Sequence, residues 1–150
     1  MPVMGLDVGD RSLGIALSDP SRTIARGVET IRGATFSRDR CLHRIKELVG
    51  RDRVDTIVVG MPRNAAGEEG FQAQKVRDFI DQLRRCVDTR VVTFDERFSS
   101  VSAERVLREG RVSLARRKQL RDKLAATIIL QTYLDRERFQ RENSPVPETE

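Results

Sequence analysis

The order of apolar and polar positions along the chain predicts three short strands followed by alternating strands and helices. The first three apolar segments are separated only by short polar turns, which is typical of antiparallel strands. Continuous apolar runs later in the chain predict two more strands, and apolar residues spaced three and four apart predict helices. The predicted strands are residues 3–8, 13–18, 24–31, 54–60 and 90–94, and the predicted helices are 36–49, 71–86, 100–108 and 114–139.

This order of elements predicts an α/β fold with one mixed sheet. The fourth and fifth strands are each reached through a helix, so we expect them to run parallel to the first strand, with helices on both faces. A length of 150 residues is usual for a single domain with one core. We expect that domain to occupy residues 1–139. The polar tail at 140–150 lacks an apolar pattern, so we expect it to be disordered.

The composition favours a nucleic-acid partner. Charged residues make up 34% of the chain and the net charge is +5, and a basic surface attracts polyanions. The longest apolar stretch, at 124–130, is too short to span a bilayer, and the first strand begins without a charged and then apolar leader. Cys41 and Cys86 fall in separate helices, which predicts neither a disulfide framework nor a thiolate metal site. We therefore expect a cytoplasmic protein with no membrane partner.

An acidic residue interrupts the first predicted strand. Asp7 lies among Met4, Leu6 and Val8. A carboxylate exposed at a strand edge, or one that forms a turn, would be a purely structural explanation. Burying an unpaired carboxylate is costly, however, and costly ionisable groups concentrate at functional sites. We therefore interpret Asp7 as a candidate functional residue.

A second acidic position follows the fifth predicted strand. Asp95 and Glu96 come directly after its apolar residues, and ligands bind at the carboxyl ends of the strands in such sheets. The structural alternative is that both acids favour the start of a helix capped by Ser99 or Ser100.

A third acidic position, Asp122, lies on the final predicted helix. That helix is apolar nearly all round over residues 124–130, which predicts that it is buried. Asp122 falls opposite the stripe that contains Leu124 and Ile128, and on the side of Ala126. The structural alternative is an ion pair with Lys118, one turn earlier.

The three acidic positions together indicate a metal site. Acids at two strand ends and on a helix that packs over the sheet can converge on divalent cations. Oxygen ligands alone suit Mg²⁺ or Mn²⁺, and the single histidine, His43, lies in another helix. A basic protein that holds two such ions can clamp the attacking and leaving oxygens of a phosphodiester. We therefore expect Asp7 to be a metal ligand.

Four segments of the chain resemble the YqgF family, also called RuvX. They are "GLDVGDRSLGIALSD", "VVGMPRNAAGEEG" with the following "QAQKVRDFIDQL", "DERFSS" and "RDKLAATIILQTYLD". They occur in the family's order and span residues 3–135. The resemblance implies a ribonuclease H-like fold, with a five-stranded sheet of order 3-2-1-4-5 and helices on both faces. Arg121 departs from the pattern, because an apolar residue is expected at that position.

The resemblance also implies metal-dependent nuclease chemistry. The expected catalytic residues and ligands of Mg²⁺ or Mn²⁺ are Asp7, Asp122 and one acid of the "DER" segment. We favour Glu96, with Asp95 and Arg97 in supporting roles. The family is linked to processing of the 5′ end of pre-16S ribosomal RNA and, by kinship with RuvC, to Holliday-junction resolution. A resolvase would act as a symmetric homodimer, whereas a processing nuclease could act as a monomer.

Clustered arginines indicate where nucleic acid would bind. Arg63 lies in a glycine-containing segment that is either an ordinary loop or a phosphate-binding one. A second basic segment precedes and opens the final helix, and its structural alternative is a solvated helix start. The residues expected to contact nucleic acid are Arg11, Arg63, Arg111, Arg116, Arg117 and Lys118.

Two other functions remain open at this point. The segment "LDVGDRSLGIALSD" is also similar to the first phosphate-binding hairpin of actin-like ATPases and sugar kinases. Those proteins hold a nucleotide between two such domains, and this chain has the length of one. A non-catalytic accessory protein that binds nucleic acid would have the same fold, and only an activity assay separates it from a nuclease.

Overall fold

The structure is a computed structural model that describes residues 1–62, 70–95 and 114–143, with side chains from residue 123 onward in the last range. Five strands form one sheet. They are β1 (Val3–Val8), β2 (Ser12–Ser18), β3 (Ala25–Arg32), β4 (Thr56–Met61) and β5 (Arg90–Asp95). The helices of the described residues are η1 (Gly33–Thr35), α1 (Arg38–Asp52), α2 (Phe71–Cys86) and α4 (Leu114–Asn143).

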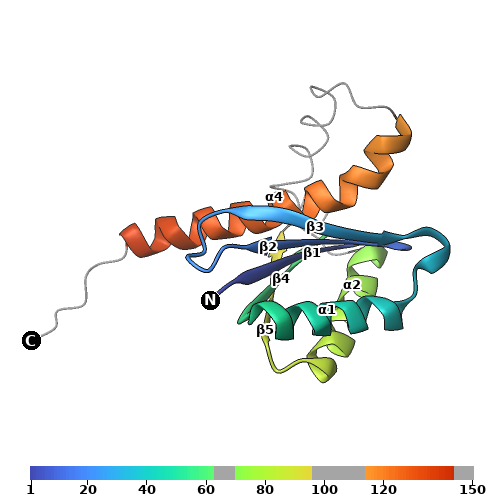
Figure 1. The fold of residues 1–150 in the computed structure, drawn as a ribbon, viewed down its shortest axis with the longest axis horizontal. Helices are drawn as coiled ribbons and strands as arrows, with labels where there is room; N and C mark the ends of the chain where they lie inside the picture. Colours follow the sequence, from blue (N-terminus) through green and yellow to red (C-terminus); the bar gives the residue numbers. More distant parts are fainter. Residues whose placement is uncertain (63–69, 96–113, 144–150) are drawn as a thin grey trace, which may run out of the picture.

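The sheet has the expected mixed topology. Its strand order is β3-β2-β1-β4-β5. Strand β2 runs antiparallel to β1 and β3, whereas β4 runs parallel to both β1 and β5. Helices α1 and α2 cover one face and α4 covers the other (Figure 1). The predicted order 3-2-1-4-5 with helices on both faces is therefore confirmed.

Side chains from alternate strand positions build two cores. Met4, Leu6 and Ile57 belong to the larger core, which lies between the sheet and α1 and α2. Val3 and Val58 belong to the smaller core beneath α4. Because successive residues of a strand point to opposite faces, the core to which a residue belongs shows which face its neighbours occupy.

Two helix boundaries differ from the predicted ones. Helix α1 begins at Arg38 rather than at residue 36, because the backbone N–H of Arg40 donates to Ser37 Oγ at 3.1 Å and makes Ser37 the N-cap. Helix α4 extends to Asn143, so residues 140–143 of the expected disordered tail are helical. Asn143 Nδ2 donates to the Phe139 carbonyl, one turn earlier, at 2.8 Å. The predicted helix at 100–108 and the tail at 144–150 lie outside the described residues.

No helix in the described part of the chain is long and apolar enough to cross a membrane. Both cysteines are free: Cys41 is buried in the larger core and Cys86 ends α2.

Candidate functional site

Asp7 lies near the carboxyl end of β1, on the face that α4 covers. The side chains of Met4 and Leu6 enter the larger core, whereas Val3 belongs to the core beneath α4. Alternation therefore places Asp7 on the α4 side of the central strand. The residue is partly buried. Strand β1 has a neighbouring strand on each side, so Asp7 is not a carboxylate exposed at a strand edge.

The neighbours of Asp7 on both adjacent strands are glycines. Gly14 of β2 is its partner in the antiparallel register. On the other side Val59 of β4 is the partner of Leu6, so the next residue, Gly60, lies at the level of Asp7. Neither neighbour carries a side chain that could fill the space around the carboxylate. A glycine inside a strand often marks a close approach by a backbone or ligand, so Gly14 and Gly60 are a signal for this site that the acidic residues alone do not give.

Helix α4 contacts β1 directly at Gly5. A Cβ added to Gly5 would lie 2.7 Å from Leu130 Cβ and 3.0 Å from the Ala126 carbonyl oxygen. The helix runs opposite in direction to β1 (Figure 1). Position 122 precedes Ala126 by one turn, about 6 Å along the helix axis, and Asp7 follows Gly5 by two residues, about 6.6 Å along the strand. These two steps have the same direction, so the backbone at Asp122 reaches the level of Asp7.

The buried side of α4 is the one on which the helical spacing places Asp122. Ala126, Ile129 and Leu130 are buried against the sheet. Leu124 and Ile128 are only partly buried, so the expectation of a helix buried all round is wrong for that side. The sheet covers one side of α4, and a one-sided contact leaves the opposite side chains in partial contact with solvent. The side chain of Asp122 lies outside the described residues.

Asp95 ends β5 on the face opposite to Asp7. It is in register with Met61, whose side chain enters the larger core. Its neighbour Phe94 packs in the core beneath α4, so alternation places Asp95 on the side of α2. Glu96 and Arg97 lie outside the described residues. Among the side chains that the structure describes, no group of three or more His, Cys, Asp or Glu gathers into a metal site.

The residues predicted to contact nucleic acid lie on different segments of the chain. Arg11 lies exposed in the turn between β1 and β2. Arg116, Arg117 and Lys118 lie on the first turns of α4, and their side chains are outside the described ones. The start of α4 and the β1–β2 turn are at the same end of the molecule (Figure 1). Arg63 and Arg111 lie outside the described residues.

An ion pair connects the β1–β2 turn to α2. Lys75 Nζ lies 2.8 Å from Asp10 Oδ1, and this ammonium holds the pKa of the Asp10 carboxyl below its usual value. The turn itself is closed by a hydrogen bond of 2.8 Å from the Gly9 N–H to the Ser12 carbonyl. The segment that follows Asp7 is therefore held both by its own backbone and by α2.

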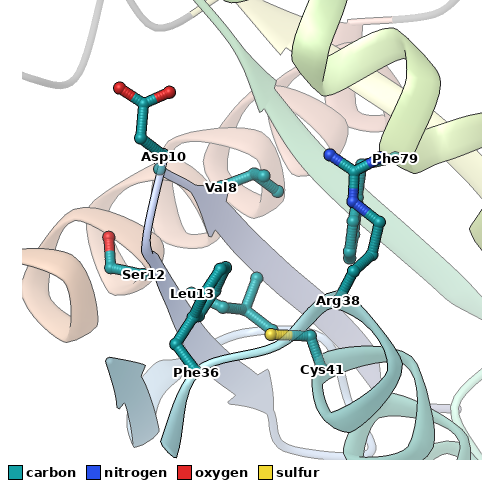
Figure 2. Close-up of a pocket in the computed structure, with 9 residues that line it drawn as sticks. Val8, Asp10, Ser12, Leu13, Phe36, Arg38, Cys41 and Phe79 are labelled. Carbon is teal, nitrogen blue, oxygen red and sulfur yellow. The ribbon is translucent and has the colours of Figure 1, made fainter. Parts of the chain in front are cut away.

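A hollow of about 40 Å³ lies beneath this turn, on the face of α1 and α2. Its lining includes Val8, Arg38, Phe79 and the thiol of Cys41 (Figure 2). Burial raises the pKa of Cys41 to about 11. A thiol with a raised pKa is a poor nucleophile, and Cys41 belongs to the larger core, so we interpret it as a core residue.

Sequence comparisons connect the chain with one family. The RuvX family, described as Holliday junction resolvase, matches residues 1–136. A relative from Halothermothrix orenii is 50% identical over 135 residues, which cover 90% of this chain and 95% of that protein. One from Moorella thermoacetica is 49% identical over 136 residues, with 91% and 96% covered, and one from Desulforamulus reducens is 44% identical over 135 residues, with 90% and 97% covered. All three are named, provisionally, as pre-16S rRNA nucleases.

Solved structures show the same fold at lower identity. Thermus thermophilus RuvC in complex with a Holliday junction is similar with a TM-score of 0.58 and 18% identity, over 93% of this chain and 96% of that chain. The fowlpox virus resolvase in complex with junction DNA has a TM-score of 0.56 and 13% identity, over 91% and 99%. These matches confirm the expected ribonuclease H-like fold, because fold is what a structural match at such identities demonstrates.

Proposed function

Because the chain belongs to the RuvX family of phosphodiester hydrolases, we propose that it is a divalent-metal-dependent nuclease that processes the precursor of 16S ribosomal RNA. The substrate follows from the names of relatives that are 42–50% identical over about 90% of this chain. The observation that carries the chemistry is the position of Asp7, at the carboxyl end of the central strand with Gly14 on one side and Gly60 on the other.

The residues around Asp7 fit a site for Mg²⁺ or Mn²⁺. A partly buried carboxylate is a hard oxygen ligand of the kind these ions select, and the flanking glycines bring no side chain of their own to it. We assign Asp122 as a second ligand because the backbone of α4 reaches the level of Asp7. When bound, one or two such ions supply Lewis acidity at the scissile phosphate.

We assign Glu96 rather than Asp95 as the third ligand. Asp95 lies on the opposite face from Asp7, beside Met61. Since alternation places Asp95 on the face away from Asp7, we assign the other acid of the segment to the site. Asp95 and Arg97 then have supporting roles, and Arg63, Arg111, Arg116, Arg117 and Lys118 bind the phosphates of the RNA.

A substrate panel tests this proposal. Purified protein is given a 16S rRNA precursor with its 5′ leader, an unrelated single-stranded RNA and a four-way DNA junction, each in Mn²⁺ and in EDTA. We expect cleavage of the precursor in Mn²⁺ and none in EDTA. Asp7→Asn should lower the rate by orders of magnitude, whereas Asp81→Asn, which changes an exposed carboxylate on α2, should cleave like the parent. Cleavage in EDTA would contradict the metal site.

Junction resolution is the second candidate function, and the family description and the fold of the resolvases favour it. A resolvase cuts two strands of one junction symmetrically, so it requires two active sites and a homodimer. Paired cleavage of the junction, with the rRNA precursor left intact in the same panel, would favour this function over the first.

A further inference from the structure

Three arginines from different elements surround the end of the β1–β2 hairpin. Arg11 lies in the turn itself, and Arg32 ends β3 in register with Ser12. Arg38 opens α1 and lines the hollow beneath the turn together with Gly9 (Figure 2). All three arginines are exposed. We call them the hairpin-end arginines.

Two acidic residues near the hairpin-end arginines are paired with other cations. Asp10 is paired with Lys75 at 2.8 Å, and Glu29 of β3 is paired with Arg44 of α1 at 2.9 Å. The next two residues of α1, Asp39 and Arg40, have opposite charges that offset one another. Within the described part of the chain, neither Arg11 nor Arg38 forms an ion pair. The end of the hairpin therefore has a net positive charge.

The hairpin-end arginines lie at the same end of the sheet as Asp7, where β1 ends. The turn begins directly after β1, about two residues or 7 Å beyond Asp7. Ile31 enters the larger core, so alternation places Arg32 on the α4 side, the side of Asp7. Arg38 lies on the other side, against the hollow. The hairpin-end arginines therefore lie on both faces of this end of the sheet.

We propose that the hairpin-end arginines form a contact surface for the phosphates of single-stranded RNA, which holds the substrate strand where it leaves the metal site. Arg32 and Arg38 thereby extend the RNA path to the side of β3 and α1. The planar guanidinium donates two hydrogen bonds to one phosphate, and exposed side chains from three elements can follow a flexible backbone. The inference rests on the proposed nuclease function, because it takes its substrate from there.

Salt-dependent RNA binding in EDTA tests the surface apart from cleavage. A variant that combines Arg11→Gln, Arg32→Gln and Arg38→Gln is compared with the parent by fluorescence anisotropy, with a labelled single-stranded piece of the rRNA precursor at increasing KCl. Each phosphate contact contributes about 0.7 to the slope of log K against log salt for single strands. Loss of three contacts should reduce the slope by about 2 and weaken binding at low salt by tenfold or more.

The matched control removes the same charge from the opposite end of the sheet, where β1 begins. It combines Arg51→Gln, Arg53→Gln and Arg85→Gln, at the ends of α1 and α2, and should keep the parent's slope and bind within about twofold of it. Thermal melts establish that both variants are folded. Three results would contradict the proposed contact surface. They are an equal loss of slope in the two variants, an unchanged slope in the hairpin-end variant, and no salt-dependent RNA binding by the parent. Absence of Mn²⁺-dependent cleavage with the slopes as expected would instead count against the proposed function alone.

Discussion

The carboxylate of Asp7 is either a metal ligand or one partner of an ion pair. Its strand neighbours, Gly14 and Gly60, bring no side chain that could pair with the carboxylate. A metal ligand that lies among other carboxylates is repelled by them whenever the ions are absent. A carboxylate that anchors an ion pair is instead stabilised by its partner at all times. The two explanations predict opposite effects on stability when the charge is removed.

We expect Asp7→Asn to be at least as stable as the parent in metal-free buffer, because the change removes like-charge repulsion and keeps nearly the same shape. The variant should also gain less stability from Mn²⁺, because a ligand stabilises the folded state according to its affinity for that state. Thermal melts of both proteins, in EDTA and in Mn²⁺, measure this. Marked destabilisation of the variant in EDTA would contradict the metal-ligand role and favour the ion pair.

Gly5 determines how closely α4 approaches β1. A Cβ at this position would lie 2.7 Å from Leu130 Cβ, so Gly5→Ala requires the helix to move away from the strand. We expect a loss of about 1–3 kcal/mol in the free energy of unfolding, as for other overpacked cores. The stabilisation by Mn²⁺ should decrease too, because Asp122 is on the displaced helix.

The control for Gly5→Ala is Gly50→Ala. Gly50 is exposed within α1 and has no neighbouring atoms within 4 Å of an added Cβ. Alanine should there stabilise the protein by about 0.5–1 kcal/mol, because it restricts the unfolded chain and suits a helix. Urea denaturation compares the two variants. Equal effects would show that the contact with Leu130 does not limit the approach of α4.

Helix α4 is fastened to the sheet by its second half. Arg22 Nη2 lies 3.0 Å from Glu137 Oε2, and the same arginine reaches Asp55 at 3.4 Å. Gln131 accepts a hydrogen bond of 2.8 Å from the Ala25 N–H and donates one of 3.0 Å to the Thr23 carbonyl. These contacts, which hold α4 to the sheet, therefore lie at the other end of the strands from Asp122.

We expect Glu137→Ala to cost about 1–3 kcal/mol, because it removes a charge-assisted contact of Arg22 and the acceptor of the Tyr133 hydroxyl. Glu142→Ala on the same helix changes an exposed residue and should have an effect within about 0.5 kcal/mol. Denaturant titration of both variants makes the comparison. A similar effect of the two changes would mean that the contact with Arg22 does not fasten α4.

The loop from β2 to β3 depends on the ionised form of Asp19. Asp19 Oδ1 accepts hydrogen bonds from the Thr23 and Ile24 N–H groups at 2.8 and 2.9 Å. These bonds, together with one from the Ser21 hydroxyl, lower its pKa from 3.8 to about 2. A lowered pKa in the folded state means that the stabilisation is complete above the unfolded pKa and is lost as the pH decreases toward the folded one.

The melting temperature of the parent should therefore decrease between about pH 4 and pH 2 partly because Asp19 becomes protonated. Asp19→Asn cannot be protonated, so its decrease over this range should be smaller. Asp88→Asn, at an exposed position after α2, should follow the parent. Identical pH profiles for Asp19→Asn and the parent would exclude this contribution of the loop.

The exposed apolar side chains of the described residues come from separate segments of the chain. Met1, Ile24, Phe71 and Phe139 are each more than half exposed; Met1 precedes β1, Ile24 precedes β3, Phe71 opens α2 and Phe139 lies near the end of α4. A stable homodimer usually buries a contiguous apolar patch. We therefore expect a single chain in sedimentation velocity across a wide range of concentration, and a cleavage rate on RNA that is proportional to protein concentration. A stable dimer would contradict this expectation and favour junction resolution.

The sequence by itself determined the elements of this protein and the faces of its strands. The apolar spacing predicted the strands and the helices α1, α2 and α4 to within a few residues, because backbone geometry repeats every two residues in a strand and every 3.6 in a helix. The residues also identified Asp7 as an unusual carboxylate, and the family resemblance gave the order of the strands. The apolar pattern placed the start of α1 too early, because the cap at Ser37 rather than the first apolar residue sets the boundary.

The tertiary structure alone decided what surrounds those residues. The register between strands places Gly14 beside Asp7 and Met61 beside Asp95. The contact of α4 with Gly5 and the ion pair between Arg22 and Glu137 join segments more than 100 residues apart. No local pattern encodes these pairings, because a strand or helix has the same period whichever partner it meets. Register and approach are set only when distant side chains compete for the same space in the folded core.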